Sequence, residues 1–430
     1  MSHRIETRST RRELLGPAAV RIVTYPVTIG CSLLTAGLLI QAASVDDYAA
    51  YTLVASILPI LAFFDLGFGG AATNWATEYG NSPTAAMKAQ LQRRLQRALV
   101  TAGLPVLCGI LLSVFLASWG LRNDYKWLDI PIAVLSITLA LYFLSVPSAI
   151  ISKLLIGMGR SSTWIIIQVL QPLTALGFAA LSIGLNRHEL IPITPALSLL
   201  TMCSVGAYFG LRSIRTRLKD VMVSRSSTSV REPIFAAAWP MLIILIANPL
   251  ALSSDRLLLS WFGSPSDVAT YSLGAQLFAP ALALLSTMGM SLWPHFAKKR
   301  FHGSNASPWP MTIIFTLAAL VGSALLLALS PWLASVISGG QIILPLLLLL
   351  CLSASFVVQA AQLPIGMYMM HGSGPKFQAG LLVVMFMMKF VLSLLWIPLL
   401  GAGGPALATA ASILFCQVAP GVYLVVRKIA

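Results

Sequence analysis

The chain has 430 residues, of which 57% are hydrophobic and only 10% are charged, and its formal net charge is +15. A soluble protein carries about a quarter of its residues as charges, so the composition excludes a soluble globular domain and indicates a polytopic membrane protein. The net charge does not indicate nucleic-acid binding, because the basic residues lie in short loops between apolar runs, where they orient membrane helices.

The apolar runs predict an all-α fold of about twelve transmembrane helices, since each crossing needs about 20 apolar residues. The first run follows Arg4, Arg8, Arg11 and Arg12, and it is longer than the core of a signal peptide. We therefore expect an uncleaved first helix. The predicted spans are 18–43, 48–75, 98–119, 130–152, 162–185, 190–211, 234–261, 268–293, 309–330, 342–370, 377–399 and 403–426.

The distribution of Lys and Arg predicts that both termini are cytoplasmic. In this orientation 22 of the 28 basic residues fall on the inside and three fall in outside loops. Three more, Arg21, Arg256 and Lys389, lie within spans. A wrong helix count would destroy this alternation, so the charge bias supports twelve spans.

Residues 212–232, "RSIRTRLKDVMVSRSSTSVRE", are basic, rich in serine and without apolar periodicity, which is typical of a cytoplasmic linker. The linker divides the chain into predicted six-helix bundles at 1–211 and 233–430. Another inside segment, "MKAQLQRRLQRAL" at 87–99, is basic and amphipathic. Its pattern fits a helix on anionic membrane lipids, and equally a solvated cytoplasmic helix.

The sequence "SVDDYAAYTL" at 44–53 recurs as "SPSDVATYSL" at 264–273. Asp47 and Asp267 would each cap a helix, which by itself could explain the likeness. However, both copies stand where an outside loop leads into the second helix of its half. Because six is an even number of helices, the halves would be parallel repeats, an architecture of transporters whose substrate path lies at the repeat interface.

Two motifs carry a family resemblance: "FDLGFGGAATNWATEYG" at 64–80 and "LLIGMGR" at 154–160. They resemble the second helix and a glycine-basic turn of bacterial polysaccharide flippases, the Wzx-like branch of the multidrug/oligosaccharidyl-lipid/polysaccharide exporter superfamily. The resemblance implies a V-shaped twelve-helix protein of the bacterial plasma membrane. Such a protein flips polyprenyl-pyrophosphate-linked oligosaccharides, such as O-antigen units, from the inner to the outer leaflet. It implies H⁺ or Na⁺ as coupling ion, and polysaccharide polymerase and ligase machinery as partners, but no transferable site residues.

Ionisable residues within spans are the candidate substrate-binding residues, because a charge at mid-membrane costs about 2.5–3.5 kcal/mol on insertion scales. Lys389 is the strongest candidate, since it lies 13 residues beyond the cytoplasmic Lys376, or about 20 Å along a helix. The alternatives for Lys389 are a structural partner or a misplaced helix end. The sequence therefore predicts that Lys389 contacts an anionic substrate.

Arg21 and Asp65 are predicted to lie in the inner half of the membrane, as an ion pair or as a headgroup ligand and a protonatable switch. Asp255 and Arg256 lie about two turns from the outer end of their span, where we expect an interfacial pair. The cations among these residues outnumber the carboxylates. A net positive cavity suits a pyrophosphate that must be shielded while it crosses hydrocarbon.

The five cysteines all fall within apolar runs and the five histidines are scattered, so we expect no disulfide framework, no metal site and no cofactor. A membrane polysaccharide polymerase or acyltransferase would need acid/base or nucleophilic residues gathered in one site, and no such motif is found. We therefore expect a transporter rather than an enzyme. A cation-coupled multidrug exporter of the same superfamily remains the main alternative. A lipid II flippase would have fourteen spans, and a channel or scaffold is a further alternative.

Overall fold

A computed structural model describes residues 2–65, 67–81, 83–123, 126–127, 130–223, 254–301, 307–369 and 374–429. These residues are mostly helical, and the strands among them form one short antiparallel pair, β1 (Lys126–Trp127) with β2 (Ile130–Pro131). Ten helical segments in the described part of the chain are long and apolar enough to span a membrane. The prediction of an all-α polytopic membrane protein is therefore confirmed.

The ten segments coincide with ten of the twelve expected spans. The seventh expected span, 234–261, lies mostly outside the described residues, of which 254–262 are helical. The second, 48–75, is broken into α2 (Val45–Ile60), the 3-10 turn η1 (Leu61–Asp65) and α3 (Phe68–Asn81). The break follows Pro59, whose ring lacks an N–H donor, and includes Gly67 at φ +77°, a conformation that glycine adopts without strain.

The packing divides the chain into two units. One unit contains residues 1–38 and 61–232, and the other contains 39–60 and 233–430. The predicted repeats at 1–211 and 233–430 are continuous segments of the sequence, whereas these units group the residues that pack together. The first part of the second expected helix, α2, therefore packs with the C-terminal helices, whereas its second part, from residue 61 onward, packs in the first unit.

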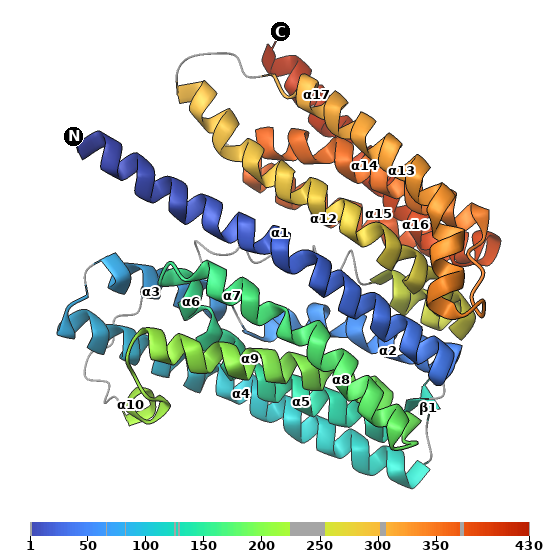
Figure 1. Ribbon diagram of the computed structural model, residues 1–430, viewed down its shortest axis with the longest axis horizontal. Coiled ribbons are helices and arrows are strands. Elements are labelled where there is room, and N and C mark those ends of the chain that lie inside the picture. The colour runs from blue at the N-terminus through green and yellow to red at the C-terminus, as the bar shows by residue number, and fades with distance from the viewer. Residues whose placement is uncertain are drawn as a thin grey trace. The chain divides into compact units, whose positions relative to one another are not determined.

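In the first unit, α5 (Ile132–Ser152) is the central helix and packs against α4 (Ala85–Asn123) and α9 (Thr194–Ser213), with α8 (Leu170–Gly184) beside α9 (Figure 1). Its apolar core includes Leu155, Trp164 and Met202. The predicted amphipathic segment 87–99 is the start of α4, and Leu91 and Leu95 on its apolar face are buried in protein. The remaining elements of this unit are α1 (Ser2–Ala42), α6 (Leu154–Gly157), α7 (Ser161–Gln168), η2 (His188–Ile193) and α10 (Leu218–Val223), and the last four residues of α1 fall in the second unit.

In the second unit, α14 (Leu346–Tyr368) packs against α12 (Pro265–Phe301), α13 (Trp309–Ser338) and α16 (Gly403–Ile413), while α15 (Gly374–Leu400) packs against α16 (Figure 1). The chain ends with the π-helical turn η3 (Leu414–Val418) and α17 (Ala419–Ile429). Met385, Ile413 and Cys416 form an apolar cluster between α15 and these last elements. The predicted linker 212–232 starts with the end of α9 and contains α10, and its part from 224 onward lies outside the described residues.

The repeated sequence forms the same local structure twice. Ser44 accepts a hydrogen bond from the backbone N–H of Asp47 at 3.0 Å, and its hydroxyl donates to the Asp47 carboxylate at 2.8 Å. Ser264 and Asp267 repeat these contacts at 3.1 and 2.8 Å. Each copy therefore caps its own helix, α2 or α12, with a serine at the N-cap and a carboxylate three residues later.

The two copies also pack directly against each other within the second unit. The hydroxyls of Thr52 and Ser272, which hold equivalent positions in the repeat, are hydrogen-bonded at 3.1 Å. The equivalent Leu53 and Leu273 are both fully buried. The contact of α2 with α12 thus joins equivalent residues of the two copies, and we call it the α2–α12 seam.

Candidate functional site

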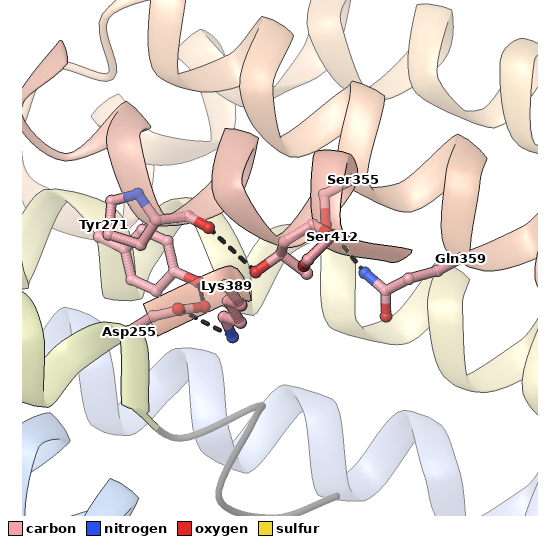
Figure 2. Close-up of polar contacts among 8 residues, drawn as sticks. Asp255, Tyr271, Ser355, Gln359, Lys389 and Ser412 are labelled. Carbon is pink, nitrogen blue, oxygen red and sulfur yellow. Dashed lines mark hydrogen bonds and ion pairs between the residues drawn. The ribbon is translucent and has the colours of Figure 1, made fainter. Parts of the chain in front are cut away.

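Lys389 on α15 lies at the centre of a buried polar group in the second unit (Figure 2). Its Nζ lies 2.9 Å from Oδ1 of Asp255, which belongs to the helical segment 254–262. The hydroxyl of Tyr271, on α12, donates a hydrogen bond of 2.6 Å to Oδ2 of the same carboxylate. Three separate helices therefore supply an ammonium, a carboxylate and a phenol to one site.

Burial makes this charged group energetically demanding. Lys389 is 1% exposed and Asp255 is 3% exposed. Desolvating two charges costs several kcal/mol per ion, and the attraction between them roughly offsets this cost. Removing one partner is much worse, at about 3–5 kcal/mol, because the remaining charge is then buried without compensation. The pair adds little net stability, so its presence in a membrane helix points to function.

Further polar groups line the helices around the pair. Ser393 lies one turn beyond Lys389 on α15 and is fully buried, and its hydroxyl has no hydrogen-bond partner among the described residues. Figure 2 also shows Ser412 of α16 near Lys389, while Gln359 of α14 donates to Ser355 at 3.0 Å. The interior of the second unit therefore has hydrogen-bonding capacity that the described part of the protein leaves unused.

Arg256 does not pair with Asp255 as expected from the sequence, because the Asp255 carboxylate is directed to Lys389 and Tyr271. Adjacent residues on a helix point in different directions, which explains the difference. Arg256 instead lies in the neighbourhood of Tyr48, Tyr51 and Tyr271. Its Nε is buried and has no hydrogen-bond partner in the described part of the chain.

In the first unit, the two motifs that carry the family resemblance pack against each other through α3 and α6. Gly157 of "LLIGMGR" touches the backbone of Thr73, and a Cβ at this position would collide with the Thr73 carbonyl and with Ala76. Asp65 accepts a hydrogen bond of 2.7 Å from the backbone N–H of Gly67. The glycines of both motifs therefore permit close helix contact at this point.

Lys153, which the sequence places among cytoplasmic loop charges, is the cation that interacts with Asp65. Its side chain packs over Gly69, where a Cβ would lie 3.4 Å from Cγ of Lys153 and 2.7 Å from Oδ2 of Asp65. Its Nζ also lies 5.4 Å from the ring centre of Trp164. Asp65 and Lys153 thus form a second charged group.

Arg21 and Asp65 are not brought together. Both belong to the first unit, and none of the ion pairs among the described residues joins them. Arg21 is exposed on α1, beside Tyr25. The ion-pair interpretation of these two residues is therefore not supported, and a headgroup contact for Arg21 remains a prediction.

Of the five candidate residues, the fold brings Lys389 and Asp255 into contact and places Arg256 beside them through Tyr271. Sequence reasoning missed Tyr271 and Lys153 as members of the charged groups. The sequence does contain a feature that could have identified Tyr271, because it is the counterpart of Tyr51 in the repeated sequence. Lys153 has no such feature, since its position at a predicted helix end is typical of an ordinary orienting charge.

The described residues contain no group of three or more His, Cys, Asp or Glu side chains that could hold a metal ion. The five cysteines are free thiols. The polar groups of this site are thus an ammonium, a guanidinium, hydroxyls and carboxylates, which bind ions and hydrogen-bonding ligands.

Comparison with solved structures places the fold. An inward-closed structure of the lipid II flippase MurJ superposes with a TM-score of 0.69 at 12% identity, covering 95% of this chain and 86% of that one. An inward-facing multidrug resistance MATE transporter of the MOP superfamily gives a TM-score of 0.66 at 12% identity, covering 94% and 96%. A MOP superfamily transporter from Pyrococcus furiosus, described as having a binding pocket of reverse polarity, gives 0.59 at 15% identity, covering 96% of each chain.

No curated protein sequence matches the chain. The sequence profile of the polysaccharide biosynthesis protein family matches residues 19–299, which is more than half of the chain. The resemblance carried by the two motifs is therefore confirmed at the level of the family. The chain therefore belongs to the polysaccharide biosynthesis protein family.

Proposed function

We propose that this protein flips polyprenyl-pyrophosphate-linked oligosaccharides from the inner to the outer leaflet of the bacterial plasma membrane by alternating access. The proposed architecture has twelve spans in two parallel six-helix repeats with cytoplasmic termini. The product would serve the synthesis of a cell-surface polysaccharide such as O-antigen. Polymerase and ligase machinery would act on it next, and a gradient of H⁺ or Na⁺ would drive transport.

The buried Lys389 is the observation that supports this substrate class. It is an ammonium that is 1% exposed within a membrane helix, with the guanidinium of Arg256 one residue from its partner Asp255. Cations in a low-dielectric interior bind diphosphates strongly through charge-assisted hydrogen bonds. A lipid-linked sugar diphosphate needs such groups, because its headgroup must leave water.

The second candidate function is export of drugs, which the structural likeness to multidrug transporters favours. That likeness rests on 12% identity and concerns the fold. A transporter of cationic drugs would need buried carboxylates in excess over buried cations. In the described part of the second unit, the buried Asp255 carboxylate already has the ammonium of Lys389 as its partner.

The test is a deletion strain in which lipid-linked oligosaccharides are extracted and probed from outside in spheroplasts. We expect complete repeat units to accumulate and to be shielded from the outside probe, and expression of the wild-type chain to clear them. The variant Asp255→Asn/Lys389→Met, which leaves neither charge buried without its partner, should insert normally but fail to clear them. Accumulation exposed on the outside would instead indicate a polymerase, and no accumulation together with new drug sensitivity would indicate a drug exporter.

A further inference from the structure

We propose that Asp255 occupies, in the empty transporter, the position on Lys389 that the diphosphate of the substrate takes when it binds. The substrate would thus enter by displacing an internal carboxylate. This inference rests on the proposed function and concerns the regulation of the same site.

The geometry of the pair suits an exchange. Oδ1 of Asp255 lies 2.9 Å from Nζ of Lys389 but accepts no hydrogen bond of standard geometry, so charge alone holds this side of the carboxylate. The other oxygen is fixed by a short hydrogen bond of 2.6 Å from Tyr271. The carboxylate can therefore leave the ammonium without losing its aligned hydrogen bond.

Unused donors lie on the two helices that carry the pair. The hydroxyl of Ser393, one turn from Lys389, and the Nε–H of Arg256 are buried and have no acceptor among the described residues. Buried donors without acceptors are rare in folded proteins and call for an explanation. A diphosphate carries acceptor oxygens, so it can satisfy such donors and neutralise the ammonium at the same time.

After it leaves Lys389, the Asp255 carboxylate still has a hydrogen-bond donor. Tyr271, to which it is bonded, interacts electrostatically with Arg256 as well. Asp255 would therefore remain on Tyr271 with a guanidinium nearby when Lys389 turns to the ligand. The hydrogen bond from Tyr271 thus offsets part of the cost of separating the carboxylate from Lys389 in a membrane interior.

The exchange predicts a penalty on affinity. While Asp255 covers Lys389, only a small fraction of the protein can bind the anion, and the apparent dissociation constant rises in proportion. Asp255→Asn removes the competing charge but keeps an oxygen that can accept the Tyr271 hydroxyl. We expect this variant to bind a diphosphate at least about tenfold more tightly than the wild type, and to release it more slowly during transport.

The experiment uses the purified full-length protein in detergent, titrated with a short-chain polyprenyl diphosphate and monitored by calorimetry and by thermal unfolding. Asp255→Asn should gain affinity and show a larger rise in unfolding temperature on addition of ligand than the wild type. Lys389→Met and the double variant Asp255→Asn/Lys389→Met should both lose binding. The polyprenyl alcohol of equal length should not distinguish the variants, and inorganic pyrophosphate tests whether the headgroup suffices.

If Asp255→Asn bound the diphosphate no more tightly than the wild type, the proposed exchange would be wrong. It would also be wrong if the double variant bound the diphosphate as tightly as the wild type. The outcome is separable from the proposed function. A deletion strain without accumulated lipid-linked oligosaccharide would refute the function itself. If lipid-linked oligosaccharide accumulated in that strain but the affinity for the diphosphate were the same in the wild type and the variants, only the role of Asp255 would be refuted.

Discussion

At the scale of single residues, the distinctive feature of this protein is an ion pair that is buried away from water. Lys389 and Asp255 are almost fully buried, Lys389 on a helix apolar enough to span a membrane and Asp255 within the seventh expected span. An apolar pair of similar size would be at least as stable. The pair is therefore better explained by what it binds than by the stability it provides.

The stability of the pair can be tested without any substrate. Lys389→Met alone leaves Asp255 buried without its cation and should destabilise the protein by about 3–5 kcal/mol. Asp255→Asn/Lys389→Met, in which an amide oxygen can still accept the Tyr271 hydroxyl, should recover most of that loss. Thermal unfolding of the purified variants measures both effects. If the double variant were as unstable as the single one, the site would owe its stability to packing and not to charge.

At the scale of secondary-structure elements, the α2–α12 seam is the feature that the repeated sequence produces. Both helices start at the same Ser-x-x-Asp cap, and the hydroxyls of Thr52 and Ser272 meet at 3.1 Å. Tyr48 of α2 also donates to Gln276 of α12 at 3.0 Å. The seam is held by a few hydrogen bonds and by small and apolar side chains, so it can separate and re-form without burying an unpaired charge.

If the transport cycle separates α2 from α12, a covalent link across the seam should stop it. Thr52→Cys/Ser272→Cys, in a background without the five native cysteines, should form a disulfide on oxidation. We expect oxidised cells to lose the clearance of lipid-linked oligosaccharide and to regain it with reductant.

A matched control joins elements that stay within the C-terminal helices. Met388→Cys with the native Cys416 retained would link α15 to η3, where the two sulfur atoms lie 3.4 Å apart. This link should leave clearance intact. Full activity of the protein with a completed disulfide between positions 52 and 272 would mean that the seam stays closed throughout transport.

At the scale of the whole molecule, the division of the sequence and the division of the packing are different. The sequence predicts a second repeat after a basic linker at 212–232, but residues 39–60 pack with the C-terminal helices. The C-terminal half of the sequence therefore lacks one helix of its own packing unit. Leu273 of α12 is fully buried in the intact unit, where α12 packs against α2.

This division predicts how the chain behaves when it is cut. Fragments 1–223 and 224–430, expressed together, should assemble and purify as a complex, because α2 on the first fragment covers α12 on the second. Fragment 224–430 expressed alone should be less stable and more readily degraded. Leu53→Ala in the first fragment should weaken the association, as loss of a buried leucine typically costs about 2–5 kcal/mol. An isolated second fragment as stable as the complex would contradict this assignment of α2.

Much of the fold follows from local sequence. Apolar runs of about 20 residues can only be helices in a membrane, because every backbone N–H and C=O must be bonded within the segment. Ten of the twelve expected spans therefore appear as expected among the described residues. The break after Pro59 follows from the missing backbone N–H of proline, whereas hydropathy alone does not change at a helix interruption.

Lys389 stands out in the sequence alone, because a cation so far from any loop calls for an anionic substrate, a structural partner or a shifted helix end. Its partner could be identified only from the packing of the helices. Asp255 and Tyr271 lie more than a hundred residues away on two other helices, and no local sequence pattern relates them to Lys389. The same holds for Asp65, whose cation is Lys153 and not Arg21. Hydrophobic periodicity and composition determine where helices form along the chain. Ion pairs depend instead on which helix faces contact each other, and this is determined by tertiary packing.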